Sequence, residues 1–176
     1  MNSRERVQAV LQGKIPDRVP IDIGATRTTS MSIFSYVELK KYLKVEGDPP
    51  KVFDVYQMLP LVELSIAQRL HTDVIIAPRF TYKLKTNLSG WKSGILAGNI
   101  EVLFPIDFNP LVNKVGDWII TEDNGIQAKM PKNGYYFDYL ESTYSNEYID
   151  VSKIQFETWK EEDFSFIEKT FRNKIL

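Results

Sequence analysis

The alternation of apolar and polar positions predicts a short helix at the start of the chain. Asn2 precedes this helix and Glu5 follows three residues later, which is the spacing of a capping box. Gly13 is suited to the left-handed conformation that ends a helix, and residues 19–23 then have the character of a strand. Apolar residues recur at helical spacing and predict a buried stripe. The members of this stripe are Val7, Val10 and Leu11.

The same pattern predicts three more helices and one buried strand. Two helices cover residues 30–43 and 60–70, and the segment between them, residues 51–55, is predicted to be extended. Residues 73–77 form an apolar run that Pro78 closes, which is typical of a parallel strand covered on both faces. A polar segment from about residue 151 leads into the last helix, whose apolar residues recur at spacings of three and four. They are Phe164, Ile167, Phe171 and Ile175.

Between residues 79 and 140 the chain consists of short, turn-rich segments typical of β-structure. Asn124 and Gly125 separate residues 118–121 from residues 126–130, and an Asn-Gly pair at such a position predicts a hairpin. The aromatic residues of this part would either wall a flat pocket or form a small core of their own. They are Trp91, Phe104, Phe108, Trp118, Tyr135, Tyr136 and Phe137.

Composition narrows the classes of partner. The chain has 176 residues, enough for one domain, and 43% of them are hydrophobic. Lysine and arginine number 22 against 23 acidic residues, so no broad basic surface for nucleic acid or an anionic membrane is expected. The chain has no cysteine, which excludes disulfides within it and fits a cytoplasmic protein. No run approaches the about 18 apolar residues of a membrane span.

The run Pro16-Asp17-Arg18-Val19-Pro20 directly after the first helix, together with residues 69–78, resembles the uroporphyrinogen decarboxylase superfamily. The resemblance implies an α/β protein, a (β/α)8 barrel of the TIM type, of which this chain is the amino-terminal part. Residues 1–78 would supply the leading helices and the first barrel strand, residues 79–140 a β-rich insertion, and residues 141–176 a polar segment and the following helix. On this view the chain is an incomplete single domain, a fragment or a truncated product.

Within this superfamily, the run Pro20-Ile21-Asp22-Ile23-Gly24-Ala25 is more similar to the branch of corrinoid-dependent methyltransferases. There the resemblance implies a zinc ion that activates an acceptor thiol and a methylated corrinoid as donor. The partners would be a corrinoid protein or a small-molecule substrate. With His71 as the only histidine and no cysteine, we expect no metal site and no cofactor within this segment.

The alternative chemistry is decarboxylation in tetrapyrrole biosynthesis. The resemblance places Asp73 where the family has its catalytic aspartate, although an aspartate before an apolar strand is commonly a turn residue or a helix-end partner. The family's pair of arginines four residues apart is missing, since residues 22–29 contain Arg27 alone. Because paired guanidinium groups are the usual means of holding several carboxylates, this difference argues against uroporphyrinogen as the substrate.

Two arginines are candidate substrate-binding residues. Arg27 lies in a loop rich in glycine and threonine, and Arg79 follows the predicted first strand, where it would face the mouth of a barrel. Each would bind a carboxylate or phosphate, and the competing interpretations are solvent exposure for Arg27 and a local backbone contact for Arg79. We expect the segment alone to be catalytically inactive. The competing hypothesis is a stable, non-catalytic interaction module built around the β-rich part.

Overall fold

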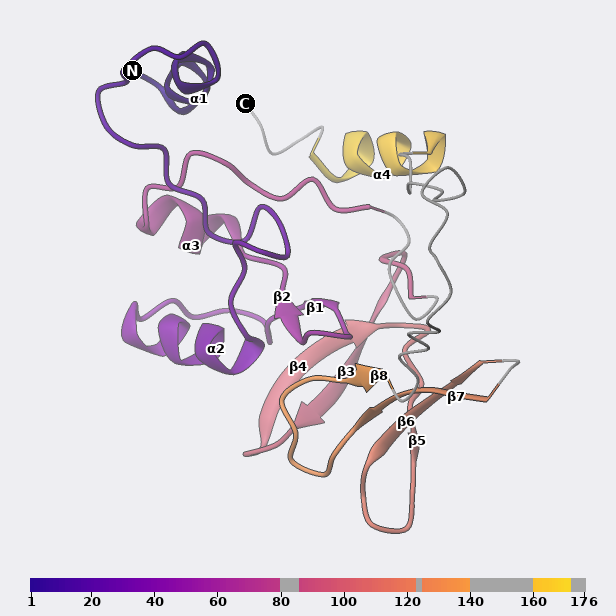
Figure 1. Ribbon diagram of the computed structural model, residues 1–176. Helices are drawn as coiled ribbons and strands as arrows, with labels where there is room; N and C mark the ends of the chain where they lie inside the picture. Colours follow the sequence, from indigo (N-terminus) through magenta and orange to yellow (C-terminus); the bar gives the residue numbers. More distant parts are fainter. Residues whose placement is uncertain (80–85, 123–124, 140–159, 172–176) are drawn as a thin grey trace, which may run out of the picture.

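The computed structural model describes residues 1–79, 86–122, 125–139 and 160–171. Within these ranges it is a mixed α/β structure in which short helices accompany small antiparallel sheets (Figure 1). The described strands form two two-stranded sheets and one four-stranded sheet, and they do not close into a barrel. No helix in these ranges is both long and apolar enough to cross a membrane.

Helix α1, Ser3–Leu11, begins as the sequence predicts. The side chain of Asn2 accepts a hydrogen bond from the Glu5 amide, and the Glu5 side chain accepts one from the Asn2 amide, both at 2.9 Å. Gly13 adopts the left-handed conformation with φ of 69°. The prediction of a buried apolar stripe is wrong, because Arg6 and Ala9 are the buried residues and Leu11 is 81% exposed. The helix is attached through the charged groups of Arg6 rather than through its apolar face.

The next two helices flank a short antiparallel pair of strands. Helix α2, Ile33–Tyr42, is confirmed within the predicted range and is capped by Ser32. Strand β1, Val52–Asp54, pairs with strand β2, Leu59–Pro60, and helix α3 covers Leu64–Arg69. The third helix therefore begins later than predicted, since Pro60 is paired with Val52 as part of a strand.

The predicted strand over residues 73–77 is wrong as a regular element. Only Val74 makes a β-bridge there, a parallel one with Asp22, and Ile75 is 45% exposed. The run lacks regular strand structure because its pairing is limited to this one position among the described residues. Residues 73–77 and 19–23 nevertheless run side by side in the same direction at this bridge.

The β-rich part forms a hairpin and a four-stranded meander (Figure 1). The sheet β5–β6–β7–β8 follows chain order and is antiparallel throughout. The predicted hairpin is confirmed by the pairing of β6 with β7, and Asn124 itself lies outside the described residues. The strands are β3, Trp91–Leu96; β4, Ile100–Pro105; β5, Leu111–Val112; β6, Trp118–Glu122; β7, Gly125–Met130; and β8, Asp138–Tyr139.

One hydrophobic core joins the helical and β-rich parts. It contains Ile33 and Tyr36 of α2 together with Phe104 of β4 and Phe137, all of them buried. The rings of Phe104 and Phe108 lie 4.9 Å apart between centroids, and those of Phe108 and Phe137 lie 6.1 Å apart. These three aromatic residues thus form core rather than the wall of a flat pocket. This core therefore contains residues from both sides of residue 78, the predicted boundary between the leading helices and the β-rich insertion.

The remaining members of the aromatic set lie nearer the surface. Tyr135 and Tyr136 are more than half exposed, and Tyr135 meets Phe34 edge to face at 4.8 Å. The Lys51 ammonium lies 5.2 Å above the ring of Trp91.

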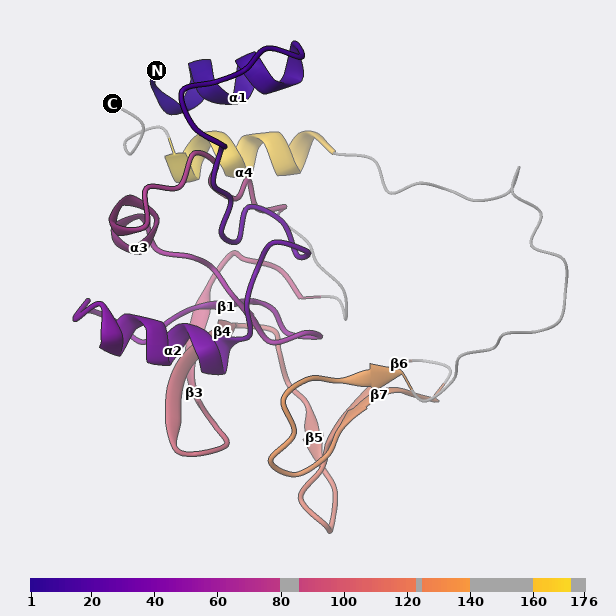
Figure 2. The same cartoon turned by 60° about the vertical axis from the view of Figure 1, so that its left-hand side comes forward.

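Helix α4, Glu161–Phe171, confirms the predicted last helix as far as the structure describes it, and Ile175 lies outside that part. Figure 2 shows α1 and α4 at the end of the molecule away from β5, β6 and β7.

Candidate functional site

The carboxylate of Asp73 is the centre of a cluster of charged groups. Its side chain has no exposed surface. The Ile21 amide donates to Oδ2 at 2.8 Å, and Arg18 donates to Oδ2 at 2.6 Å and to Oδ1 at 3.1 Å. Arg6 donates a further hydrogen bond to Oδ1. Both carboxylate oxygens therefore accept at least two hydrogen bonds, and three separate segments of the chain meet at this residue.

Arg6 connects this carboxylate to a second one, Asp17. Its Nε atom donates to Asp17 Oδ1 at 2.7 Å and its Nη2 atom donates to Oδ2 at 2.9 Å. The contact is bidentate, the geometry in which an arginine holds a carboxylate most firmly. The remaining Nη1 atom of Arg6 points to Asp73, so one guanidinium bridges two aspartates. We call Arg6, Asp17, Arg18 and Asp73 the Asp73 cluster.

The cluster keeps its two carboxylates ionised. Burial by itself raises the pKa of Asp73, but the hydrogen bonds from the Ile21 amide and Arg18 outweigh burial and hold that pKa well below its usual range. The hydrogen bond from Arg6 likewise lowers the pKa of Asp17. A carboxylate fixed in its charged form with both oxygens occupied is poorly suited to accept or deliver a proton. These contacts fit a structural role for Asp73, and its catalytic role remains a prediction.

Arg27 lies in a packed loop and contacts a different carboxylate. Its Nε atom lies 2.5 Å from Oδ2 of Asp54, which is 2% exposed. Oδ1 of Asp54 accepts from the amides that follow it in the turn between β1 and β2. The loop packs tightly against Val62, because Gly24 has φ of 83° and a Cβ there would lie 2.5 Å from Cγ2 of Val62. Arg27 thus ties the loop to β1.

The structure does not bring the predicted site residues together. Arg79 is half-buried and is the last residue described before a gap, and neither Arg27 nor Arg79 is a hydrogen-bond or ion-pair partner of Asp73. His71 is exposed. Among the residues that the structure describes, no three histidine, cysteine or acidic side chains gather where a metal could bind. The described residues therefore do not themselves offer a ligand set for a zinc ion.

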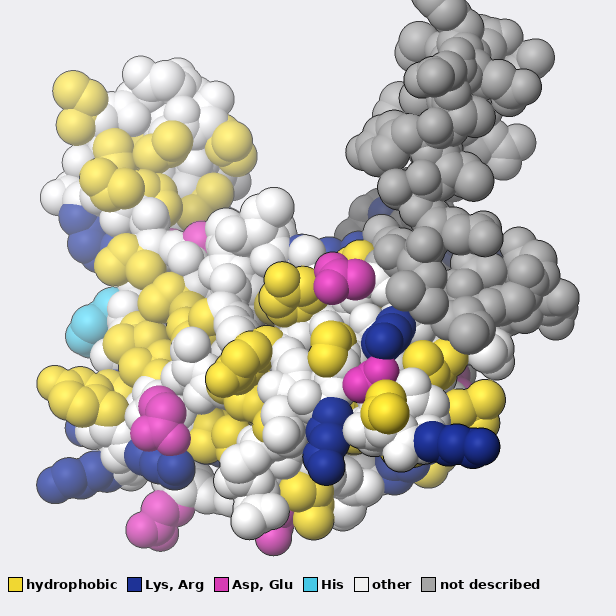
Figure 3. Space-filling view, turned by 60° about the horizontal axis from the view of Figure 1, so that its bottom comes forward, with side chains coloured by type: hydrophobic (Ala, Val, Ile, Leu, Met, Phe, Trp, Pro, Cys, Tyr) yellow, Lys and Arg dark blue, Asp and Glu magenta, His cyan; other side chains and the backbone are white. Residues whose placement is uncertain are grey.

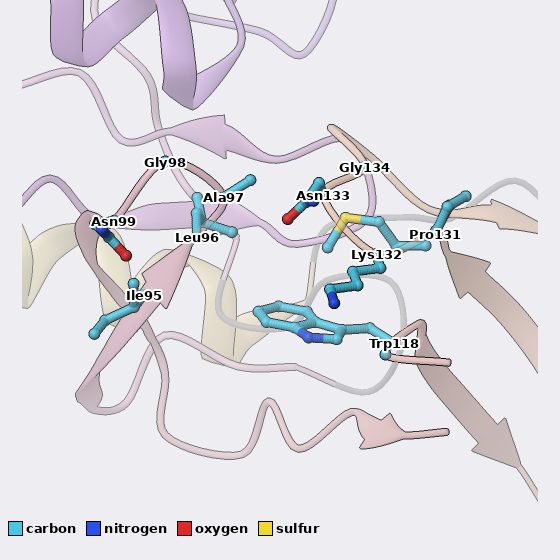
Figure 4. Close-up of a pocket in the computed structure, with 12 residues that line it drawn as sticks. Ile95, Leu96, Ala97, Gly98, Asn99, Trp118, Pro131, Lys132, Asn133 and Gly134 are labelled. Atoms are coloured by element: carbon cyan, nitrogen blue, oxygen red, sulfur yellow. The ribbon is translucent and has the colours of Figure 1, made fainter. Parts of the chain in front are cut away.

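A pocket of about 250 Å³ opens between two turns of the β-rich part (Figure 4). One turn joins β3 to β4 and carries Asn99, and the other spans residues 131–134 after β7. Trp118 and Lys132 line it. Trp118 belongs to the aromatic set that the sequence offered as a pocket wall or a small core, whereas Lys132 was not singled out as a binding residue. No local sequence pattern predicts this pocket, because its two turns are distant in the sequence and come together only through the packing of the sheets.

Charge on the surface is mixed. On the face shown in Figure 3, basic, acidic and hydrophobic side chains are interspersed. A wider groove of about 750 Å³ lies at the carboxyl end of α2, and its charged lining residues are three lysines, Lys40, Lys41 and Lys44, and three acidic residues, Glu46, Asp48 and Glu101. Lys40 is already bound to Glu63 at 2.6 Å. This groove therefore offers no uniform field for an anionic polymer.

The side chains that bind Asp73 could not be predicted from the sequence. Arg6 and Arg18 are charged residues on a helix and a turn, where exposure is the ordinary expectation. The only local sign is the position of Arg6 in the middle of a helix that carries both apolar and polar residues.

Comparison of the chain with protein-family models, with curated proteins and with solved structures found no match.

Proposed function

We propose that this chain belongs to a uroporphyrinogen decarboxylase-like (β/α)8 protein of the branch similar to corrinoid-dependent methyltransferases. In this proposal residues 1–78 provide the leading helices, and residues 73–77, which pair only at Val74 among the described residues, would become the first barrel strand once its second neighbour is present. The supporting observation is the parallel bridge between Asp22 and Val74, which aligns the two segments that carry the resemblance. Parallel pairing of neighbouring strands is the arrangement on which such a barrel is built. The cytoplasmic location expected from the sequence is part of the proposal.

The described residues act as scaffold in this proposal. The Asp73 cluster fixes α1 and residues 17–21 against the start of the 73–77 segment. A zinc ion in such enzymes lowers the pKa of the acceptor thiol, and the described residues supply no ligand set for it. No step of methyl transfer is therefore assigned to them. The corrinoid protein or small-molecule substrate remains the proposed partner.

The proposal is tested by measuring methyl transfer from methylcobalamin to a thiol, followed through the visible absorbance of the corrinoid. The isolated chain and the native gene product, with whatever further residues it carries, are assayed side by side with zinc. We expect turnover above the uncatalysed rate from the native product and none from the chain. Turnover by the chain itself would contradict the scaffold role. Turnover by neither would contradict the family assignment, and decarboxylation of uroporphyrinogen would favour the alternative chemistry.

A second candidate function, a non-catalytic interaction module, is favoured by the shared core. Ile33, Tyr36, Phe104 and Phe137 come from both sides of residue 78 and pack into one cluster. A unit with its own core is expected to unfold cooperatively without a partner. Sedimentation and a thermal melt separate the two ideas. A monomer with one sharp transition supports the module, whereas aggregation supports a scaffold that requires the rest of a barrel.

A further inference from the structure

We propose that the pocket between the β3–β4 turn and residues 131–134 binds a small aromatic carboxylate. The pocket has a volume of about 250 Å³. That is slightly below the range of about 300 to 1,000 Å³ found for drug-sized ligands, so it suits a single ring with one charged substituent. It lies apart from the Asp73 cluster, with which it shares no lining residue.

Trp118 provides the flat surface of the pocket. Part of its ring packs against the aromatic core, with centroid distances of 5.9 Å to Phe104 and 6.0 Å to Phe108. Another part of the side chain is accessible and lines the pocket. Because its core contacts fix the ring, Trp118 offers a rigid platform on which a second ring can stack at little entropic cost. Leu96 and Met130 are buried lining residues that add apolar contact.

Lys132 provides the charge. It is the one charged residue among the described residues that line the pocket, and its ammonium has no ion-pair partner in the described part of the chain. The nearby carboxylate of Asp117 is already occupied, with Lys129 Nζ at 2.9 Å and the Lys132 amide donating to Oδ1 at 2.9 Å. The pocket therefore carries a net positive charge that an anion can neutralise.

The backbone holds Lys132 in place. Its amide is bound to Asp117, and its aliphatic stem lies against Gly116. A Cβ at Gly116 would lie 2.8 Å from Cδ of Lys132, and Gly116 has φ of 93°, which disfavours any other residue. Figure 4 shows the Lys132 side chain close to the Trp118 ring. One ligand can thus contact the ring and the ammonium together.

Two asparagines complete the polar contacts. Asn99 has φ of 57° and Asn133 has φ of 62°, so each sits in a tight turn at the rim. Figure 4 places the two side chains on the two turns that border the pocket. Their amide groups can donate to a carboxylate oxygen or accept from a ring substituent. The combination of a platform, one cation and neutral amides is selective for a planar monoanion.

Benzoate is the probe for this site. In a titration followed by ¹H–¹⁵N correlation spectra of the full chain, we expect benzoate to shift the Trp118 indole signal and the amide signals of residues 97–99 and 132–134. Lys132→Gln should weaken binding by at least about tenfold, since it removes a charge-assisted hydrogen bond. Lys114→Gln is the matched control, because Lys114 is an exposed lysine in the turn between β5 and β6 that does not line the pocket. It should leave the affinity unchanged.

Four further ligands make the test specific. Benzamide lacks the charge, cyclohexanecarboxylate lacks the flat ring, and acetate lacks the ring altogether, so each should bind more weakly than benzoate. Glucuronate tests for a sugar acid in place of an aromatic one. Equal binding of acetate and benzoate, stronger binding of glucuronate, or full affinity in Lys132→Gln would overturn the assignment. None of these measurements depends on methyl transfer, so this inference and the proposed function fail independently.

Discussion

Arg18 and Asp73 are 55 positions apart in the sequence, and Nη1 of Arg18 lies 2.6 Å from Oδ2 of Asp73. The same oxygen accepts the Ile21 amide at 2.8 Å, and the Asp73 amide donates back to the Ile21 carbonyl at 2.8 Å. Asp73 thus binds its neighbour through both its side chain and its backbone. This reciprocal contact holds residues 19–23 parallel to residues 73–77.

Asp73→Asn should destabilise the fold. An asparagine has nearly the same shape but leaves Arg6 and Arg18 close together without the charge between them. We expect a lower melting temperature by circular dichroism than for Asp138→Asn, an aspartate at an exposed position. Equal melting temperatures for the two variants would show that the cluster contributes nothing to stability. In the native gene product, loss of turnover without loss of stability would instead favour a catalytic Asp73.

Stability should fall in acid. Burial raises the pKa of Asp73, but hydrogen bonds from the Ile21 amide and Arg18 lower it further, to below its ordinary 3.8. The pKa of Asp117 falls to about 2, led by the hydrogen bond from Lys129. Because both pKa values are lower in the folded state, their stabilisation is complete above the ordinary value and is lost as the pH falls through the folded value.

Urea unfolding between pH 7 and pH 2 measures this loss. We expect a nearly level free energy of unfolding down to about pH 4 and a decline below it. Asp73→Asn should have a shallower decline, since one of the titrating groups is absent. A decline of the same steepness in the variant would mean that other carboxylates cause the acid sensitivity.

Gly94→Ala should disturb the aromatic core. A Cβ at Gly94 would lie 2.5 Å from Cδ2 of Phe104, so the buried Phe104 ring has to move. Overpacking of this kind typically costs about 1 to 3 kcal/mol. Ser93→Ala, at the exposed neighbouring position, is the control and should change the free energy of unfolding by less than about 0.5 kcal/mol. Equal unfolding free energies would disprove the close packing of Gly94 on Phe104.

Tyr36→Phe should weaken the junction between α2 and α3. The Tyr36 hydroxyl accepts a hydrogen bond from the Glu63 amide at 2.9 Å, and Tyr36 has no exposed surface. Burial raises the pKa of Tyr36 above its usual range, so the hydroxyl stays protonated. Leaving the Glu63 amide unpaired should cost about 1 to 3 kcal/mol in chemical denaturation. Tyr42→Phe, whose residue is 82% exposed, should have almost no effect.

The features that the sequence predicted correctly have local causes. The capping box of Asn2 and Glu5 and the left-handed Gly13 depend only on residues a few positions apart. The hairpin of β6 and β7 likewise joins two segments that are adjacent in the sequence, although Gly125, which was expected in the turn, pairs with Glu122 as the first residue of β7. Such features are therefore accessible without knowledge of the rest of the fold.

The features that were missed depend on distant partners. The buried side of α1 is set by Arg6, whose partner Asp73 is 67 positions away. The predicted 73–77 strand needs a neighbour along its whole length, and the described residues provide one at Val74 only. Lys132 and Asn99 line one pocket because two sheets pack together. Periodicity reports which side of an element is apolar, but it does not report what covers that side.

Amide hydrogen exchange at Ile21 and Asp73 tests most directly whether Asp73 holds two parallel segments together. In the unaltered chain both amides are hydrogen-bonded across this contact and should exchange slowly. In Asp73→Asn both should exchange faster, while amides of the β3–β4 hairpin keep their protection. Fast exchange at Ile21 in the unaltered chain, or unchanged exchange in the variant, would contradict this account.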